Sequence, residues 1–110
     1  MFVRIDENIF FGNANNVEIK MIEFAKSKKS TSQFIVVCSS VNRIDTSGLA
    51  MFSKLSERLK SINIVLNLSD LKGSLGKNLD LQELENRLSG SIFRTAKEAM
   101  EQLTVKANSS

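Results

Sequence analysis

The chain of 110 residues contains no histidine and only one cysteine. Without histidine it has no Ser-His-Asp or Cys-His arrangement, and it lacks the usual neutral-pH base and the commonest metal ligand. A single cysteine also excludes an internal disulfide and a zinc site built from several thiolates. Cys38 ends an apolar run that begins at Phe34, where a cysteine usually serves as a small buried hydrophobe. The sequence therefore indicates no catalytic residue, metal ligand or cofactor, although these absences leave other enzyme designs open.

Tryptophan and tyrosine are absent, and the longest uninterrupted apolar run has five residues. Sites for single-stranded nucleic acid stack bases on aromatic rings, so we do not expect nucleic-acid binding. Five apolar residues are far too few to cross a bilayer, and no signal peptide is visible. We therefore expect a chain that neither spans a membrane nor is secreted. Strand character begins at Phe2, directly after Met1, which suggests a domain cut from a longer protein.

The composition is that of an ordinary globular domain, with 42% hydrophobic and 25% charged residues. We expect one domain over residues 1–105 and a disordered polar tail over residues 106–110. The net charge of +3 is spread along the chain. Only Lys26-Ser27-Lys28-Lys29 forms a basic cluster, which suits a solvated helix end and leaves open a contact with a phosphate or a lipid headgroup.

Strand and helix patterns alternate along the sequence. Strands are predicted at residues 2–5, 9–11, 33–39, 63–68 and 91–93. Residues 34–38 are all apolar, which is typical of a central strand buried on both faces. Helices are predicted between the later strands and after the last one, and parallel strands need such crossovers. The sequence therefore predicts an α/β fold, a single domain whose mixed, mostly parallel sheet has about four to five strands with about four helices packed against it.

Each predicted helix carries one apolar stripe. Asn13 or Asn15 can cap the first helix, which should end near Lys28. The residues expected on the four stripes are Ala14, Val17, Met21, Phe24 and Ala25; Leu49, Phe52, Leu55, Leu59 and Ile62; Leu75, Leu79, Leu84 and Leu88; and Ala99, Met100 and Leu103.

Signals for helix ends accompany these stripes. Thr46 is the candidate N-cap of the second helix, and Gly90 suits the C-terminal end of the third. Thr95 and Glu98 fit a capping box at the start of the last helix, since a hydroxyl precedes an acid by three positions.

The polar corner Asp45-Thr46-Ser47-Gly48 separates a buried strand from the second helix. Free backbone N–H groups and the positive end of the helix dipole favour an anion or a phosphorylated hydroxyl there. Asp and Thr are equally ordinary residues for a helix start. A catalytic site has only this cluster in its favour, because no histidine, thiol pair or complete phosphate loop accompanies it. The residues alone leave a helix cap, a regulatory hydroxyl site and an active site open.

The pattern V-x-x-I-D-S/T-S/T-G-L, followed by an amphipathic helix, resembles the STAS domain. Anti-sigma-factor antagonists share this domain with the C-terminal cytoplasmic part of SulP-type (sulfate permease) anion transporters. In the antagonists a kinase phosphorylates the hydroxyl directly after the Asp, so the resemblance implies a phosphorylation or regulatory role for Thr46, with Ser47 beside it. The residues on the pattern are Val41, Ile44, Asp45, Thr46, Ser47, Gly48 and Leu49.

A second match favours the transporter branch. Arg4-Ile5-Asp6 and Phe10-Phe11-Gly12-Asn13-Ala14 resemble the R-x-D-x-x-L-F-F-A/G-N-A opening of the transporter-attached domains. The resemblance implies a non-catalytic cytoplasmic domain of a bacterial inner-membrane sulfate or anion transporter, which modulates transport or trafficking through contacts near Asp45–Gly48. Its implied partners are the transmembrane part of the same transporter, a soluble protein or a second copy, and nucleotide binding is also permitted.

Two departures limit this resemblance. Ser74 stands where transporter-type domains usually have a proline, and Gln82-Glu83 continue a helical pattern where a Ser-Gly break is usual. Partner contacts between Lys72 and Leu88 are therefore not carried over. The alternative function is a free-standing anti-sigma-factor antagonist that is regulated by phosphorylation at Thr46.

Overall fold

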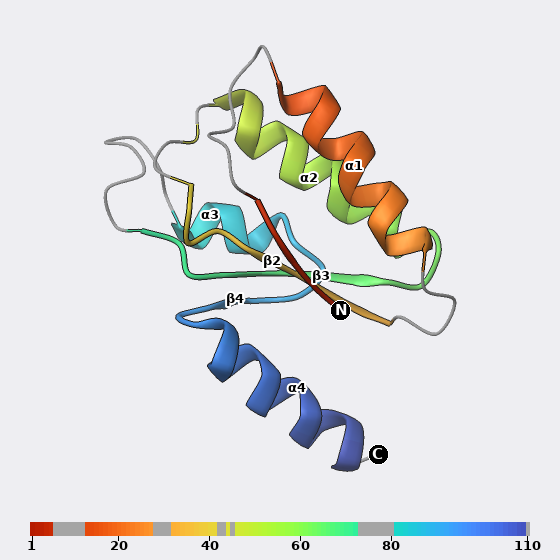
Figure 1. The fold of residues 1–110 in the computed structure, drawn as a ribbon, viewed down its shortest axis with the longest axis vertical. Helices are drawn as coiled ribbons and strands as arrows, with labels where there is room; N and C mark the ends of the chain where they lie inside the picture. Colours follow the sequence, from red (N-terminus) through yellow and green to blue (C-terminus); the bar gives the residue numbers. More distant parts are fainter. Residues whose placement is uncertain (6–12, 28–31, 42–43, 45, 73–80, 110) are drawn as a thin grey trace.

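The computed structural model describes residues 1–5, 13–27, 32–41, 44, 46–72 and 81–109. In this part of the chain, strands and helices alternate (Figure 1). The predicted strand at 9–11 lies outside the described residues. The elements are β1 (Phe2–Arg4), α1 (Ala14–Lys26), β2 (Gln33–Val37), α2 (Thr46–Lys60), β3 (Val65–Ser69), α3 (Leu81–Asn86), β4 (Ile92–Phe93) and α4 (Ala96–Ser109).

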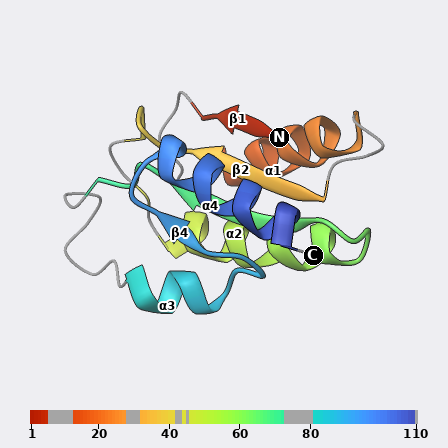
Figure 2. The ribbon, with the colours of Figure 1, turned by 90° about the horizontal axis from the view of Figure 1, so that it is seen from below.

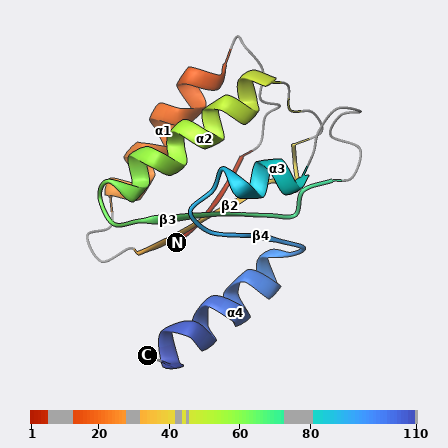
Figure 3. The same cartoon turned by 180° about the vertical axis from the view of Figure 1, so that it is seen from behind.

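The described strands form one parallel sheet in the order β1-β2-β3-β4. Since each strand lies beside its successor, the chain has to cross a face of the sheet after every strand. Helices α1, α2 and α3 make these crossings on one face, and α4 lies on the opposite face (Figure 3). The predicted α/β fold is confirmed, and the sheet is parallel throughout its described strands.

The main hydrophobic core fills the space between the sheet and helices α1–α3. Phe34 and Leu66 from the strands and Phe52 from α2 are fully buried in it. A side chain of this size stabilises the fold by about 1.5–3 kcal/mol when it leaves water. A smaller cluster of Ile35, Phe93 and Ala99, with Leu103 packed against it, joins α4 to the other face. Figure 2 shows α4 crossing the middle of the sheet, with β1 beside it rather than beneath it.

The predicted stripes of α1 and α2 need two corrections. Phe24 is 45% exposed, and Ile22 is buried in its place, because the stripe of α1 continues through residues 14, 17, 18, 21, 22 and 25. Ile62 is 41% exposed, since α2 ends at Lys60 and does not carry its stripe that far. Helix α1 also ends earlier than expected, at Lys26, where the Ser27 hydroxyl donates to the Phe24 carbonyl.

The third predicted helix ends earlier than expected. Helix α3 ends at Asn86, before Leu88, and Leu75 and Leu79 lie outside the described residues. Gly90 is therefore no helix C-cap, and it does not adopt a positive φ. The N-cap of α4 is confirmed, because the Glu98 amide donates to Thr95 Oγ1 at 3.0 Å. Helix α4 runs to Ser109, and the division into a domain (1–105) and a tail (106–110) stays a prediction.

Candidate functional site

The starts of α1 and α2 lie side by side beyond the same edge of the sheet. Each helix follows a parallel strand, so each begins at the carboxyl edge, which is where open α/β sheets usually bind ligands. Figure 1 shows the two helices packed along their length on one face of the sheet. Residues far apart in the sequence, around Ala14 and Ser47, therefore meet at one surface.

A groove of about 300 Å³ lies between these two helix starts. The small side chains of Ala14, Ser47 and Ala50 leave space between the helices, and the buried Met51 lines its inner part. Its volume is at the low end for small-molecule pockets, which suits one or two apolar side chains of a binding partner. The full lining is Ala14, Asn15, Glu18, Ser47, Ala50, Met51 and Lys54.

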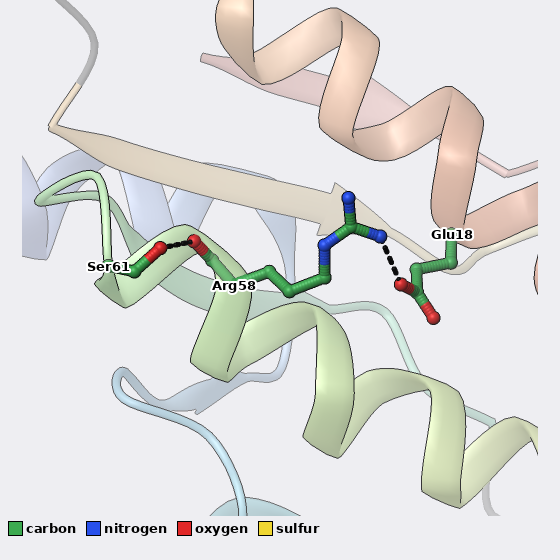
Figure 4. Close-up of polar contacts among 3 residues, drawn as sticks. All are labelled: Glu18, Arg58 and Ser61. Atoms are coloured by element: carbon green, nitrogen blue, oxygen red, sulfur yellow. Dashed lines mark hydrogen bonds and ion pairs between the residues drawn. The ribbon is translucent and has the colours of Figure 1, made fainter.

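Glu18 is a buried carboxylate in the wall of this groove. It is only 3% exposed, and a buried charge is costly unless it is paired. Arg58 of α2 supplies the partner, because its Nη1 donates to Glu18 Oε2 at 2.5 Å (Figure 4). The Ser61 hydroxyl in turn donates to the Arg58 carbonyl at 2.6 Å (Figure 4). The ion pair therefore neutralises Glu18 and ties α1 to α2 beside the groove.

Lys54 lies on the exposed rim of the groove, one helical turn before Arg58. Since Arg58 takes the Glu18 carboxylate, the groove wall offers Lys54 no second acid. Within the described part of the chain Lys54 makes no ion pair or side-chain hydrogen bond. The rim therefore carries a positive charge that no acid in the described part of the chain pairs with.

The polar corner falls on the start of α2, with one boundary correction. Thr46 is the first residue of α2 rather than the N-cap before it. Ser47 is half-buried and lines the groove, and Gly48 is buried. Asp45 lies outside the described residues. The corner and the groove are thus parts of one surface.

Other residues of the two family patterns have structural positions. Val41 and Ile44 are buried in the main core, so they anchor the connection between β2 and α2. Asn13 occupies the N-cap position of α1, although its side chain makes no capping hydrogen bond. Phe10, Phe11 and Gly12 lie outside the described residues.

The lone cysteine is held in the core as an unreactive thiol. Cys38 is completely buried, and burial together with the nearby charge of Asp70 raises its pKa to about 12. A thiol is a nucleophile only as the thiolate, so Cys38 stays inert at neutral pH. The interpretation of Cys38 as a buried hydrophobe is confirmed.

Two acidic residues of α3 make structural contacts. Glu83 pairs with Arg87 one turn later, and Glu85 Oε2 accepts a hydrogen bond from the Ile92 amide at 2.9 Å. The described residues contain no group of three cysteine or acidic side chains placed to hold a metal ion.

Sequence reasoning missed Glu18, Lys54 and Arg58. Glu18 falls on the buried stripe of α1, at spacings of four and three from Ala14 and Met21, and this periodicity could have marked it as a buried acid. No pattern in the sequence could have paired it with Arg58, which lies forty positions away. Such a pair follows only from the packing of α1 against α2.

The geometry describes a small α/β domain whose candidate site is a surface groove. A family model of the STAS domain matches residues 1–99, so the chain belongs to the STAS domain family. STAS domains are regulatory domains that mediate protein interactions and are not catalytic. The resemblance to STAS domains is thereby confirmed.

A solved structure with the same fold comes from Thermotoga maritima, a protein described as an anti-sigma factor antagonist. It aligns with a TM-score of 0.74 at 20% sequence identity, over 92% of this chain and 84% of that chain. A search of curated proteins gave no match. Among the described helices, none has both the length and the apolar character of a membrane span.

Proposed function

We propose that this STAS domain is the cytoplasmic regulatory domain of a SulP-type anion transporter, and that it binds a protein surface through the groove between α1 and α2. The partner in this proposal is the transmembrane part of the same transporter. A soluble protein or a second copy of the domain would use the same surface. The domain carries out no reaction, and it modulates transport or trafficking by being bound or released.

The observation that supports this proposal is the meeting of two family motifs at one groove. Ala14 ends the transporter-type motif that opens with Arg4, and Ser47 belongs to the motif that begins at Val41. Both residues line the same hollow although thirty-three positions separate them. A surface built from both motifs is a natural place for a contact that members of this branch share.

Thr46 and Ser47 give this surface a means of regulation. A phosphate on Thr46 would add about −1.5 to −2 charges at the start of α2, next to the groove. The helix dipole favours such a charge on the domain itself, while a docked surface would meet a new negative group. Phosphorylation at Thr46 or Ser47 would therefore act on partner binding more than on the fold.

Replacement of Thr46 tests the proposal in the full-length transporter. We expect Thr46→Asp to change partner binding or anion uptake by about threefold or more, because it places a charge beside the docking surface. The free energy of unfolding should change by less than about 1 kcal/mol, since Asp is favourable at a helix start. Uptake of labelled sulfate in vesicles and chemical unfolding of the isolated chain give the two measurements.

Thr46→Ser is the matched control, because it retains the hydroxyl without adding a charge. If Thr46→Asp and Thr46→Ser both leave binding and uptake at the wild-type values, the regulatory role of this corner is wrong.

A free-standing anti-sigma-factor antagonist is the second candidate. It is favoured by the description of the Thermotoga maritima structure that shares this fold. In that function a kinase partner would phosphorylate Thr46 and so control which protein the domain binds. The upstream coding sequence separates the two: several long apolar segments before Phe2 would favour the transporter, and a start codon at Met1 would favour the antagonist.

A further inference from the structure

We propose that the groove between α1 and α2 binds a protein segment that inserts an apolar side chain and places a carboxylate beside Lys54. This inference rests on the proposed function, because it takes the groove as the docking surface. It adds the chemistry of the segment that docks there.

The apolar part of the segment follows from the groove wall. Ala14 and Met51 are 9% and 3% exposed, so carbon atoms form the inner part of the hollow. Ala50 is exposed at its opening and presents only a methyl group. An inserted leucine or methionine side chain would remove this surface from water, which favours binding in proportion to the area covered.

The acidic part of the segment follows from the charges. Among the described groove residues two are charged, Glu18 and Lys54, and Arg58 already neutralises Glu18. Lys54 is therefore the unbalanced charge that an approaching segment meets. A partner carboxylate at this position is attracted, whereas a partner lysine is repelled.

A nucleotide fits the same groove poorly. None of the described groove residues is aromatic, so among them a base would find no ring to stack on. Lys54 is the one cation among the described groove residues, and phosphate sites usually combine several donors or cations. The observations therefore favour a protein segment.

Three designed helical peptides test the inference. They share a central leucine and differ only in the two flanking residues, which are Glu, Gln or Lys. Each peptide is titrated into the isotope-labelled chain, and NMR follows the amide signals of Ala14, Ala50 and Met51. We expect the Glu peptide to bind about two- to fivefold more tightly than the Gln peptide, and the Lys peptide to bind most weakly.

Charge reversal at Lys54 is the decisive variant. We expect Lys54→Glu to invert the order, so that the Lys peptide binds best, a result that misfolding cannot produce. Lys60→Glu is the matched control, because Lys60 is exposed on the same helix and does not line the groove. It should leave the order unchanged. Ala50→Leu, which fills the opening with a good helix former, should weaken all three peptides.

The possible failures point to different errors. If the three peptides bind equally and shift the groove signals, the acidic preference is wrong while the docking surface of the proposed function stands. If the shifts map away from the groove, or if ATP shifts the groove signals and no peptide does, both the inference and the docking surface are wrong.

Discussion

The surroundings of Gly90 explain why the connection between α3 and β4 needs a residue without a side chain at this position. A Cβ added there would lie 2.2 Å from Asn67 Oδ1 and 2.6 Å from the Leu66 carbonyl oxygen. The backbone approaches this closely because the Gly90 amide donates to the Leu66 carbonyl at 3.0 Å, and the Ser91 amide donates to Asn67 Oδ1 at 3.0 Å. Glycine is needed here for contact with β3, not for a left-handed turn.

We therefore expect Gly90→Ala to lower the free energy of unfolding by about 1–3 kcal/mol, because Asn67 or the backbone has to move. Urea unfolding followed by circular dichroism measures this loss. Asn86→Ala, at the exposed last position of α3, is the control and should change stability by less than about 0.5 kcal/mol. Equal stability of Gly90→Ala and the wild type would show that the close approach is not required.

The sequence predicted a structural role for Gly90, but it predicted the wrong one, the end of a helix. A glycine after a leucine-rich helical pattern is typical of a helix end, and that local pattern was all the sequence offered. Asn67, which makes glycine necessary, lies in strand β3 and becomes a neighbour of Gly90 only in the folded protein.

Among the elements, α4 is the helix whose start was best predicted. The capping signal is local, because the Thr95 hydroxyl accepts a hydrogen bond from the Glu98 amide, three positions later. We expect Thr95→Ala to cost about 1 kcal/mol of stability, because the amide loses its acceptor. Thr95→Asp should retain most of it, since a carboxylate also caps a helix and suits its dipole.

Urea unfolding of the two variants checks this prediction, with hydrogen exchange at the Glu98 amide as a local readout. If Thr95→Asp lowered the free energy of unfolding as much as Thr95→Ala does, a capping role for the hydroxyl would be contradicted.

For helices α1 and α2, the packing between them decided which residues are buried or paired, and the apolar pattern of the sequence decided less. Apolar spacing predicted both helices, but it put Phe24 on the buried side and gave no sign of the Glu18–Arg58 ion pair. A stripe in the sequence is wide enough to include residues at its borders, and only the neighbouring helix decides which of them is covered. The groove follows from the same packing, because small side chains of both helices happen to face each other there.

For the whole molecule, the two faces of the sheet carry unequal cores. Helices α1–α3 cover one face with the larger cluster, and α4 covers part of the other with Ile35, Phe93 and Ala99. Phe2 remains 42% exposed on β1, which α4 does not cover in Figure 2. The order of the strands and the right-handedness of crossovers put α1–α3 on one face, and α4, which joins no two strands, packs on the other.

The alkaline stability of the molecule should reflect the burial of Cys38. Its folded-state pKa of about 12 lies above its ordinary value of 9.0, so the unfolded chain loses this proton first as pH rises. The stabilising contribution is complete below pH 9 and is lost between about pH 9 and 12. Because the chain contains no tyrosine, fewer other groups change charge in that range.

We expect the stability difference between the wild type and Cys38→Ala to shift by about 1.4 kcal/mol, against the wild type, from about pH 8 to about pH 10. Urea unfolding under reducing conditions at the two pH values measures it, and the variant serves as the reference for lysine titration. A difference that does not change with pH would mean that the thiol ionises equally in both states.

The alternation of strands and helices, the buried central strand, the last helix cap and the resemblance to STAS domains could all be predicted from the sequence. These features depend on local spacing and on motifs whose residues are close together in the chain. The pairing of the strands, the need for glycine at position 90, and the burial of Glu18 with its ion pair to Arg58 depend on long-range packing and became visible in the fold. The groove between α1 and α2 also belongs to this second group, since its walls come from segments that meet only when two crossover helices pack on one face of a parallel sheet.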